Sequence, residues 1–238
     1  MIDRLINSLS ACRRFFSLGA NASSSSHSNV KPSSYALNNL DLKLLEHISY
    51  AGGFFIEAGA NDGLQQSNTL LLEKKRQWSG LLIEPVPYLA DKCRINRPKC
   101  KVANAALVPF GFDEVDIEMW TCGLMSFVDG AFKTTEEAST HLKNSQLCEQ
   151  PKPNRCSVAA RTLSSILDEH NIKHVDLLSL DVEGYEASAL RGIDFKRHVI
   201  DYILVEARYR EDIEQVLLPM YRLAAELTAR DLLYRRVG

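Results

Sequence analysis

Residues 54–63 read FFIEAGANDG, and this short stretch decides both the fold and the kind of ligand to expect. An apolar run leads into the acid Glu57, and Gly59 and Gly63 then enclose an Ala-Asn-Asp triplet. Glycine lets a chain turn tightly and lets backbone N–H groups come close to a ligand, because it carries no side chain. The stretch therefore predicts a buried strand that ends at a ligand-binding turn.

The alternation of apolar strand and amphipathic helix continues along the chain. Short apolar runs are separated by segments in which apolar residues recur at helical spacing. Strands joined by single helices form a parallel sheet with helices on both faces. The expected fold is therefore α/β, with a doubly wound and mostly parallel sheet in a three-layer sandwich. The expected strands are 54–59, 80–85, 101–108, 157–160, 174–184, 200–208 and 231–238, and the expected helices are 38–49, 67–78, 87–96, 162–171, 185–193 and 212–230.

The first 34 residues differ in composition from the rest of the chain. Residues 1–34 are basic and include a run of serines, so we expect a flexible leader before a domain at 35–238. A surface helix, an organelle transit peptide and a disordered leader all fit this composition. Within the domain, residues from about 109 to 155 interrupt the alternation with an expected hairpin and then a polar, irregular stretch. The domain therefore carries an insert.

Overall composition excludes several classes of protein. Of the 238 residues, 45% are apolar and the net charge is −2, which is typical of a globular protein and does not indicate a nucleic-acid partner. No apolar run approaches the ~18 residues of a membrane-spanning helix, so we expect a cytoplasmic location. The six cysteines include no C-x-x-C pair, which argues against a cysteine-based zinc site. We expect no metal, and we expect His170 and His174 to be solvated.

Acidic residues stand at the ends of the expected strands. Because ligands bind at the carboxyl ends of parallel strands, these acids should gather around one site. They are Glu57, Glu84, Asp181, Glu183 and Glu206. Glu84 ends the strand that follows the glycine turn, 21 residues after Gly63. A carboxylate at this place can accept hydrogen bonds from both hydroxyls of a ribose, which predicts an adenosine-containing ligand.

The chemistry of the turn separates two such ligands. A nicotinamide dinucleotide needs a G-x-G-x-x-G turn, because its pyrophosphate lies on a helix N-terminus. Here the turn is G-A-N-D-G with Glu57 just before it, and these acids would repel a pyrophosphate. S-adenosylmethionine carries a sulfonium and an ammonium group, so acids favour it. A nicotinamide oxidoreductase and a non-catalytic binding or regulatory protein on the same scaffold are the alternatives.

Four segments resemble the FkbM-type methyltransferase family. They are FIEAGANDG, LLIEPVPYLADKCRIN, KVANAAL and VDLLSLDVEGYEASALRGI, and the resemblance runs from about residue 53 to about 206. It implies a class I, Rossmann-like methyltransferase that uses S-adenosylmethionine, usually to methylate oxygen on a sugar or another hydroxylated small molecule. It also implies roles for particular residues. The methionine end would lie against Glu57, Gly59 and Asn61, the ribose on Glu84, and the adenine near Asn104 and Ala105.

Two features depart from the family pattern. Many members carry Lys two residues before the Asp of D-x-E-G, where this chain has Ser179. The family's sheet also closes with an antiparallel pair of strands, but after Tyr209 the sequence predicts one long helix and at most one strand. The expected sheet is therefore incomplete at this end.

Candidate catalytic residues follow the long apolar strand. The resemblance places Asp181 beside the transferring methyl group, and Asp181 and Glu183 are the candidate bases for deprotonating an acceptor. Capping of the next helix is an equally good interpretation of Glu183. We expect structural roles for Glu186 and Glu206.

The insert is the expected acceptor-binding part. Long irregular segments beside a site tend to be lids or binding loops, so we expect the insert to cover the site beside Asp181. Trp120, Met125 and Phe127 are its candidate pocket residues, although a small core under the hairpin also explains each of them. His141, also in the insert, is placed where it could reach a substrate. The acceptor itself cannot be identified from these residues.

Overall fold

The structure is a computed structural model that describes residues 33–147 and 152–238. Nearly all of the predicted leader, 1–34, lies outside the described residues. Within the described residues, no helix is both long enough and apolar enough to cross a membrane.

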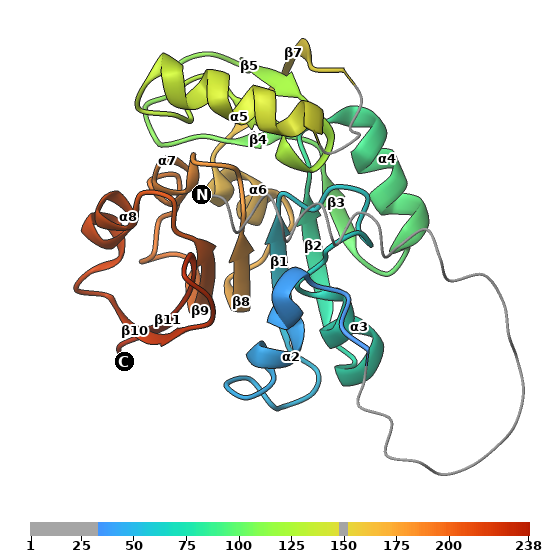
Figure 1. Ribbon diagram of the computed structural model, residues 1–238. Helices are drawn as coiled ribbons and strands as arrows, with labels where there is room; N and C mark the ends of the chain where they lie inside the picture. The colour runs from blue at the N-terminus through green and yellow to red at the C-terminus, as the bar shows by residue number, and fades with distance from the viewer. Residues whose placement is uncertain (1–32, 148–151) are drawn as a thin grey trace, which may run out of the picture.

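The main sheet confirms the predicted α/β fold (Figure 1). In the described part of the chain it has seven strands in the order β10-β11-β9-β8-β1-β2-β3. The pairs that join β9, β8, β1, β2 and β3 are all parallel, whereas β11 runs antiparallel to both β9 and β10. The strands are β1 (Phe54–Ala58), β2 (Ser79–Ile83), β3 (Lys101–Ala103), β8 (His174–Leu180), β9 (Val199–Glu206), β10 (Tyr221–Glu226) and β11 (Asp231–Arg236).

Helices cover both faces of this sheet, as predicted. One face packs on α2 (Leu40–Leu44), α3 (Leu70–Arg76) and α4 (Pro87–Asn96), through a core that includes Leu44, Leu72 and Cys93. A short 3-10 helix, η2 (Leu37–Asn39), precedes α2. The other face packs on α6 (Leu163–Glu169), α7 (Glu186–Leu190) and α8 (Arg210–Leu217), through Ile166, Leu190 and Ile213 among others. Thr162 caps α6, because its side chain accepts a hydrogen bond from Ser165 N.

The insert folds onto a second, smaller sheet. Among the described residues this sheet has four strands in the order β4-β7-β5-β6. Its elements are β4 (Ala106–Leu107), β5 (Asp116–Thr121), β6 (Phe127–Val128) and β7 (Asn154–Arg161), together with the 3-10 helix η3 (Gly123–Met125) and helix α5 (Thr135–Leu147). The predicted hairpin is confirmed, since β5 pairs antiparallel with β6. Figure 1 shows α5 and this sheet lying over the carboxyl edge of the main sheet.

The prediction of an irregular stretch after the hairpin is wrong, because α5 occupies most of it. Only His141 and Ser145 of α5 are buried. A helix with so little buried surface has no apolar stripe, and that stripe is the sequence signal for an amphipathic helix.

The predicted single strand at 101–108 is two strands in two different sheets. β3 ends at Ala103 and β4 begins at Ala106. The side-chain amide of Asn104, between them, donates to the carbonyl oxygens of Glu84 and Pro85, both at 2.8 Å. Asn104 therefore fixes the point at which the chain leaves the main sheet.

The predicted long helix at 212–230 is also wrong. Helix α8 ends at Leu217, directly before Leu218-Pro219, and β10 follows at Tyr221. Pro219 cannot continue a helix, because it lacks an N–H and disfavours helical backbone in the residue before it. With β11, β10 forms the closing antiparallel pair, so the sheet is complete.

A buried arginine holds the helical layer to the first strand. Arg97, 1% exposed, lies directly after α4. Its guanidinium contacts the Glu57 carboxylate through Nη1 at 3.0 Å and the Glu73 carboxylate through Nε at 2.6 Å. Glu57 also accepts hydrogen bonds from Ser67 Oγ and Asn68 N. The end of β1 thus depends on a buried charge that is paired with two carboxylates.

We expect Arg97→Met to lower the free energy of unfolding by about 3–5 kcal/mol, because it leaves the Glu57 carboxylate buried without its cation. Arg94→Met in α4 is the control, since it removes an exposed ion pair with Asp91 and should cost at most about 1 kcal/mol. Urea unfolding followed by circular dichroism measures both. Equal losses in the two variants would contradict the role of the buried pair.

Candidate active site

A large cavity opens at the carboxyl edge of the main sheet. Its volume is about 1440 Å³, which exceeds the ~300–1,000 Å³ of a typical single-ligand pocket. Its wall comes from the ends of the central strands, from the η2–α2 segment, from the insert and from the turn between β10 and β11. The acids predicted to gather here all line it, namely Glu57, Glu84, Asp181, Glu183 and Glu206.

The glycine turn lies against the end of β8. Gly59 has φ +83°, and a Cβ placed on it would lie 1.9 Å from the Asp181 carbonyl oxygen. Backbone hydrogen bonds fix this approach, since Gly59 N donates to Ile83 O at 3.0 Å and Asp181 N donates to Ala58 O at 3.1 Å. Only glycine fits at residue 59 without displacing one of the strands.

Glu84 closes the turn from the neighbouring strand. One carboxylate oxygen accepts from Asn61 N at 2.8 Å and the other accepts from Val86 N at 2.9 Å. Burial raises the pKa of Glu84 to about 7, although these two hydrogen bonds act in the opposite direction. Each carboxylate oxygen has a second lone pair, so the group that shapes the turn can also accept hydrogen bonds from a ligand.

The other residues predicted for cofactor binding fall into two sets. Asn61 and Ala105 line the cavity, together with Gly59 and Glu84. Gly63 and Asn104 do not line it: Gly63, with φ +82°, packs on the Arg97 side chain, and the Asn104 amide is bonded to backbone carbonyls. These two residues lie behind the residues that line the cavity and support them.

Glu57 reaches the cavity wall, but its carboxylate is engaged by the protein. Ser67 Oγ, Asn68 N and Thr69 Oγ1 donate to it at 2.6–2.8 Å, and Arg97 pairs with it. Nearby, the Asn68 amide donates to Ser179 Oγ at 3.1 Å. The main contribution of Glu57 is therefore to hold the turn.

The D-x-E-G turn carries the candidate base. Glu186 is 1% exposed and its carboxylate accepts from Val182 N and Gly184 N, so it shapes the turn as expected. Burial raises the pKa of Glu186 to about 7, with a smaller effect from Glu206. Glu183 does not cap α7, whose N-cap is Tyr185. Instead the Glu183 carboxylate lies 3.6 Å from Arg208 Nη2 and 3.8 Å from His141 Nε2.

His141 is a site residue that sequence reasoning left undecided. It comes from α5, is 4% exposed and lines the cavity. Its Nε2 lies 2.8 Å from Met125 O, and its ring packs on Phe127 and Phe132 with centroids 5.2 and 4.9 Å away. Its only sequence signal was its position in the insert, because helix α5 itself was not predicted.

The insert contributes part of the predicted pocket lining. Met125 and Phe127 line the cavity, whereas Trp120 lies under the Arg155 guanidinium at 5.4 Å. On the far wall, Arg230 Nη1 lies 3.8 Å from Glu206 Oε1. Carboxylate oxygens of Asp181, Glu183 and Glu206 come within 4.8 Å of one another, close enough to hold a cation, but acidic groups of this kind are common without one.

Comparison with known proteins identifies the family. The methyltransferase FkbM domain matches residues 57–235, most of the chain. The chain belongs to the FkbM methyltransferase family. This bears out the resemblance found in the sequence, and the cofactor of this FkbM protein is S-adenosylmethionine.

The individual relatives have low sequence identity to this chain. Methyltransferase 1 of Beauveria bassiana is 27% identical over 164 residues, and the match covers 64% of this chain and 64% of that protein. A TehB-like SAM-dependent methyltransferase from Corynebacterium glutamicum has 11% identity and a TM-score of 0.44, over 83% of this chain and 88% of the other. A putative S-adenosyl-L-methionine-dependent methyltransferase from Methanococcus maripaludis has 7% identity and a TM-score of 0.45, over 84% of each chain.

The residues of the FkbM site fit this cofactor. The glycine turn comes close to the end of the neighbouring strand β8 only because Gly59 has no side chain. The acids Glu57 and Glu84 lie at the ends of β1 and β2. Because Arg97 neutralises Glu57, the negative character of this wall comes from Glu84, and it suits a cofactor with cationic groups better than a pyrophosphate.

We expect Gly59→Ala to abolish binding of S-adenosylmethionine, because the new Cβ would push the end of β8 away from the turn. Gly52→Ala is the matched control: Gly52 also has positive φ (+78°), but nothing lies within 4 Å of its added Cβ. In both variants the alanine must adopt a positive φ, which costs roughly 1 kcal/mol of stability. Only Gly59→Ala should lose binding by calorimetry, and equal affinities in the two folded variants would contradict the assigned site.

Proposed function

We propose that this chain is an S-adenosylmethionine-dependent methyltransferase that methylates a hydroxyl oxygen of a sugar or another hydroxylated small molecule. The observation that carries the proposal is the set of carboxylates around one cavity, beside the glycine turn of a family of methyltransferases. The volume of the cavity supports two ligands, a cofactor and an acceptor. A cytoplasmic location and targeting by the leader both stay predictions from the sequence.

Cofactor binding is assigned to the turn and the two strand ends beside it. When bound, the cofactor supplies an electrophilic methyl group. Glu84 accepts hydrogen bonds from the ribose hydroxyls, and its contact with Asn61 N holds the turn in place for the methionine end. Ala105 lies at the cavity wall where the chain leaves β3, and we assign it to the adenine.

Deprotonation of the acceptor is assigned to the D-x-E-G turn. Asp181 and Glu183 face the same cavity, and transfer to oxygen requires an acceptor aligned with the methyl group and a base for its proton. We assign the base to Glu183, with Asp181 orienting the acceptor. His141 Nε2 lies 3.8 Å from the Glu183 carboxylate and Arg208 Nη2 lies 3.6 Å from it, so two basic groups lie beside the assigned base.

A non-catalytic binding or regulatory protein is the alternative. The presence of Asp181, Glu183 and His141 in one cavity favours the enzyme, since a binding protein has no need for a paired acid and imidazole beside the cofactor wall. A nicotinamide oxidoreductase is disfavoured by the acids at the turn.

The first prediction from this proposal concerns the pH dependence of cofactor affinity. Because the pKa of Glu84 is about 7 in the free protein, only the ionised fraction can accept both ribose hydroxyls. Affinity for S-adenosylhomocysteine should therefore rise about tenfold from pH 6 to pH 8. Glu84→Ala should lower the affinity by about 2–4 kcal/mol and remove this rise. Isothermal titration calorimetry measures both effects, with NAD⁺ as the competing ligand.

Controls separate this effect from general changes. Asp91→Ala removes an exposed acid of α4 and should leave the affinity unchanged. Glu186 has a similar pKa but does not line the cavity, so a pH dependence that survives in Glu84→Ala belongs to another group. Tighter binding of NAD⁺ than of S-adenosylhomocysteine would contradict the cofactor assignment.

The second prediction concerns methyl transfer. Incubation with S-adenosylmethionine and a panel of sugars and hydroxylated small molecules should yield a product heavier by one methyl group, stable to mild base as an ether is. Glu183→Gln should lower kcat about 10²–10⁴-fold while it leaves cofactor affinity within threefold. Mass spectrometry and calorimetry measure the two. Full activity in Glu183→Gln would show that another residue is the base, and a product methylated on an amine would contradict O-methylation.

A further inference from the structure

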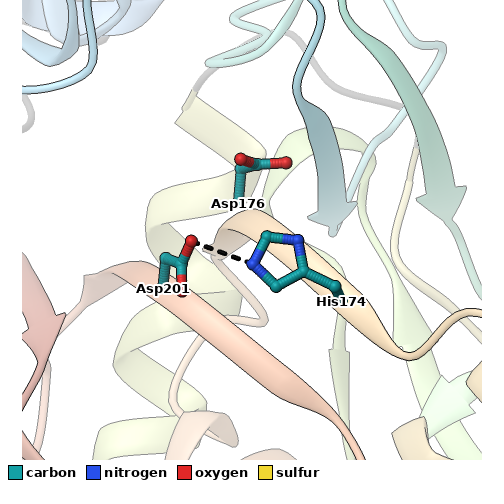
Figure 2. A group of neighbouring side chains, drawn as sticks. All are labelled: His174, Asp176 and Asp201. Atoms are coloured by element: carbon teal, nitrogen blue, oxygen red, sulfur yellow. Dashed lines mark hydrogen bonds and ion pairs between the residues drawn. The ribbon is translucent and has the colours of Figure 1, made fainter. Parts of the chain in front are cut away.

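A second group of metal-binding side chains lies at the opposite edge of the sheet. Figure 2 shows His174 and Asp176 of β8 beside Asp201 of β9, with the imidazole pointing at the Asp201 carboxylate. His174 Nε2 lies 3.0 Å from Asp201 Oδ2, and one ligand atom from each of the three residues lies within 4.8 Å of the others. Asp176 is five residues before Asp181, which directly follows the same strand, so roughly 17 Å separates this group from the cavity.

Strand geometry brings the three side chains together. His174 and Asp176 are two residues apart on β8, so they project from the same face of the strand. In the parallel pair β8–β9, Val175 lies opposite Ile200 and Leu177 lies opposite Tyr202. Asp201 therefore lies beside Asp176, and the arrangement is fixed by backbone pairing rather than by a loop.

Two hydrogen bonds fix the Asp176 carboxylate, as is common for carboxylates that bind metal ions. Tyr50 donates its hydroxyl proton to Asp176 Oδ1 at 2.6 Å, and Phe54 N donates to Asp176 Oδ2 at 2.7 Å. Each oxygen keeps a lone pair for a further partner. Hydrogen bonds of this kind orient ligating carboxylates in metal sites.

The charge of the group also favours a cation. In the described residues, no Lys or Arg forms an ion pair with Asp176 or Asp201, and His174 is the basic group that contacts Asp201. The buried acid Glu57, in contrast, has Arg97 as a permanent cation. Two carboxylates carry more negative charge than one imidazole can neutralise, so the group presents a net negative charge to solvent.

We propose that His174, Asp176 and Asp201 bind one first-row divalent metal ion, and that Zn²⁺ fits their donor set best. Zn²⁺ takes His nitrogen at ~2.0–2.1 Å and carboxylate oxygen at ~2.0–2.2 Å, which in a tetrahedron places two ligand atoms roughly 3.3–3.5 Å apart. The separation of 3.0 Å between His174 Nε2 and Asp201 Oδ2 is close to this value, and the side chains are partly exposed and can adjust. Water completes the fourth position.

A metal ion here would act on stability and not on chemistry. It would join β8 to β9 at their amino ends, while the candidate base and Glu206 lie at the carboxyl ends of the same strands. Any ion that binds the native state alone stabilises it by mass action. The site is independent of the proposed methyl transfer, so either proposal can fail without the other.

The test uses the full chain, freed of metal with a chelator, and ZnCl₂ as the probe. Calorimetry should show one Zn²⁺ bound per chain at this site and a higher melting temperature with the metal. His174→Ala and Asp201→Asn should weaken this binding at least about tenfold and remove the thermal shift. Tyr50→Phe keeps all three ligands but frees Asp176, so a smaller loss is expected.

His47→Ala is the matched control, because it removes an exposed histidine outside the group. It should bind Zn²⁺ as the wild type does. Circular dichroism without metal checks that every variant is folded. Absence of Zn²⁺ binding to the wild type, or equal binding and an equal thermal shift in His174→Ala, would overturn the proposal.

Discussion

The carbonyl oxygen of Asp181 occupies the space in which a side chain at residue 59 would begin, and the rest of the site depends on this contact. The parallel pairing of β1 and β8 brings the glycine turn and the D-x-E-G turn to the same height at the sheet edge. A backbone hydrogen bond from Asp181 N to Ala58 O then joins the two turns, and one from Gly59 N to Ile83 O holds the glycine turn to β2. A cofactor that contacts one turn therefore also contacts the other.

The acids at this edge have different tasks, although their positions in the sequence look equivalent. Glu57 points into the protein and is neutralised by Arg97 within a network of hydroxyl and amide donors. Within the described residues, no cation pairs with Glu84 in this way; burial raises its pKa, and backbone N–H groups hold its carboxylate at the cavity wall. Glu183 faces the cavity between Arg208 and His141. The same residue type thus supports the fold at one strand end and is available for a ligand or an acceptor at others.

Much of this arrangement could be predicted from the sequence, because central parallel strands are continuous apolar runs and the acids directly follow them. The elements that were missed lack such a signal. Strand β10 has mostly exposed residues of helix-forming type, and its pairing with β11 overrides their local preference. Helix α5 buries too little surface to show a stripe, so the approach of His141 to Glu183 could not be foreseen. Whether Glu57 faces a ligand or an arginine depends on Arg97, 40 residues away along the chain.

The most direct measurement of the central claim is a crystal structure of the full chain with S-adenosylhomocysteine. The account predicts that the ligand lies in the cavity between the glycine turn and the D-x-E-G turn, with both ribose hydroxyls on the Glu84 carboxylate. It also predicts the adenine beside Ala105 and the sulfur facing Asp181 and Glu183. A ribose away from Glu84, or a ligand bound outside this cavity, would contradict it.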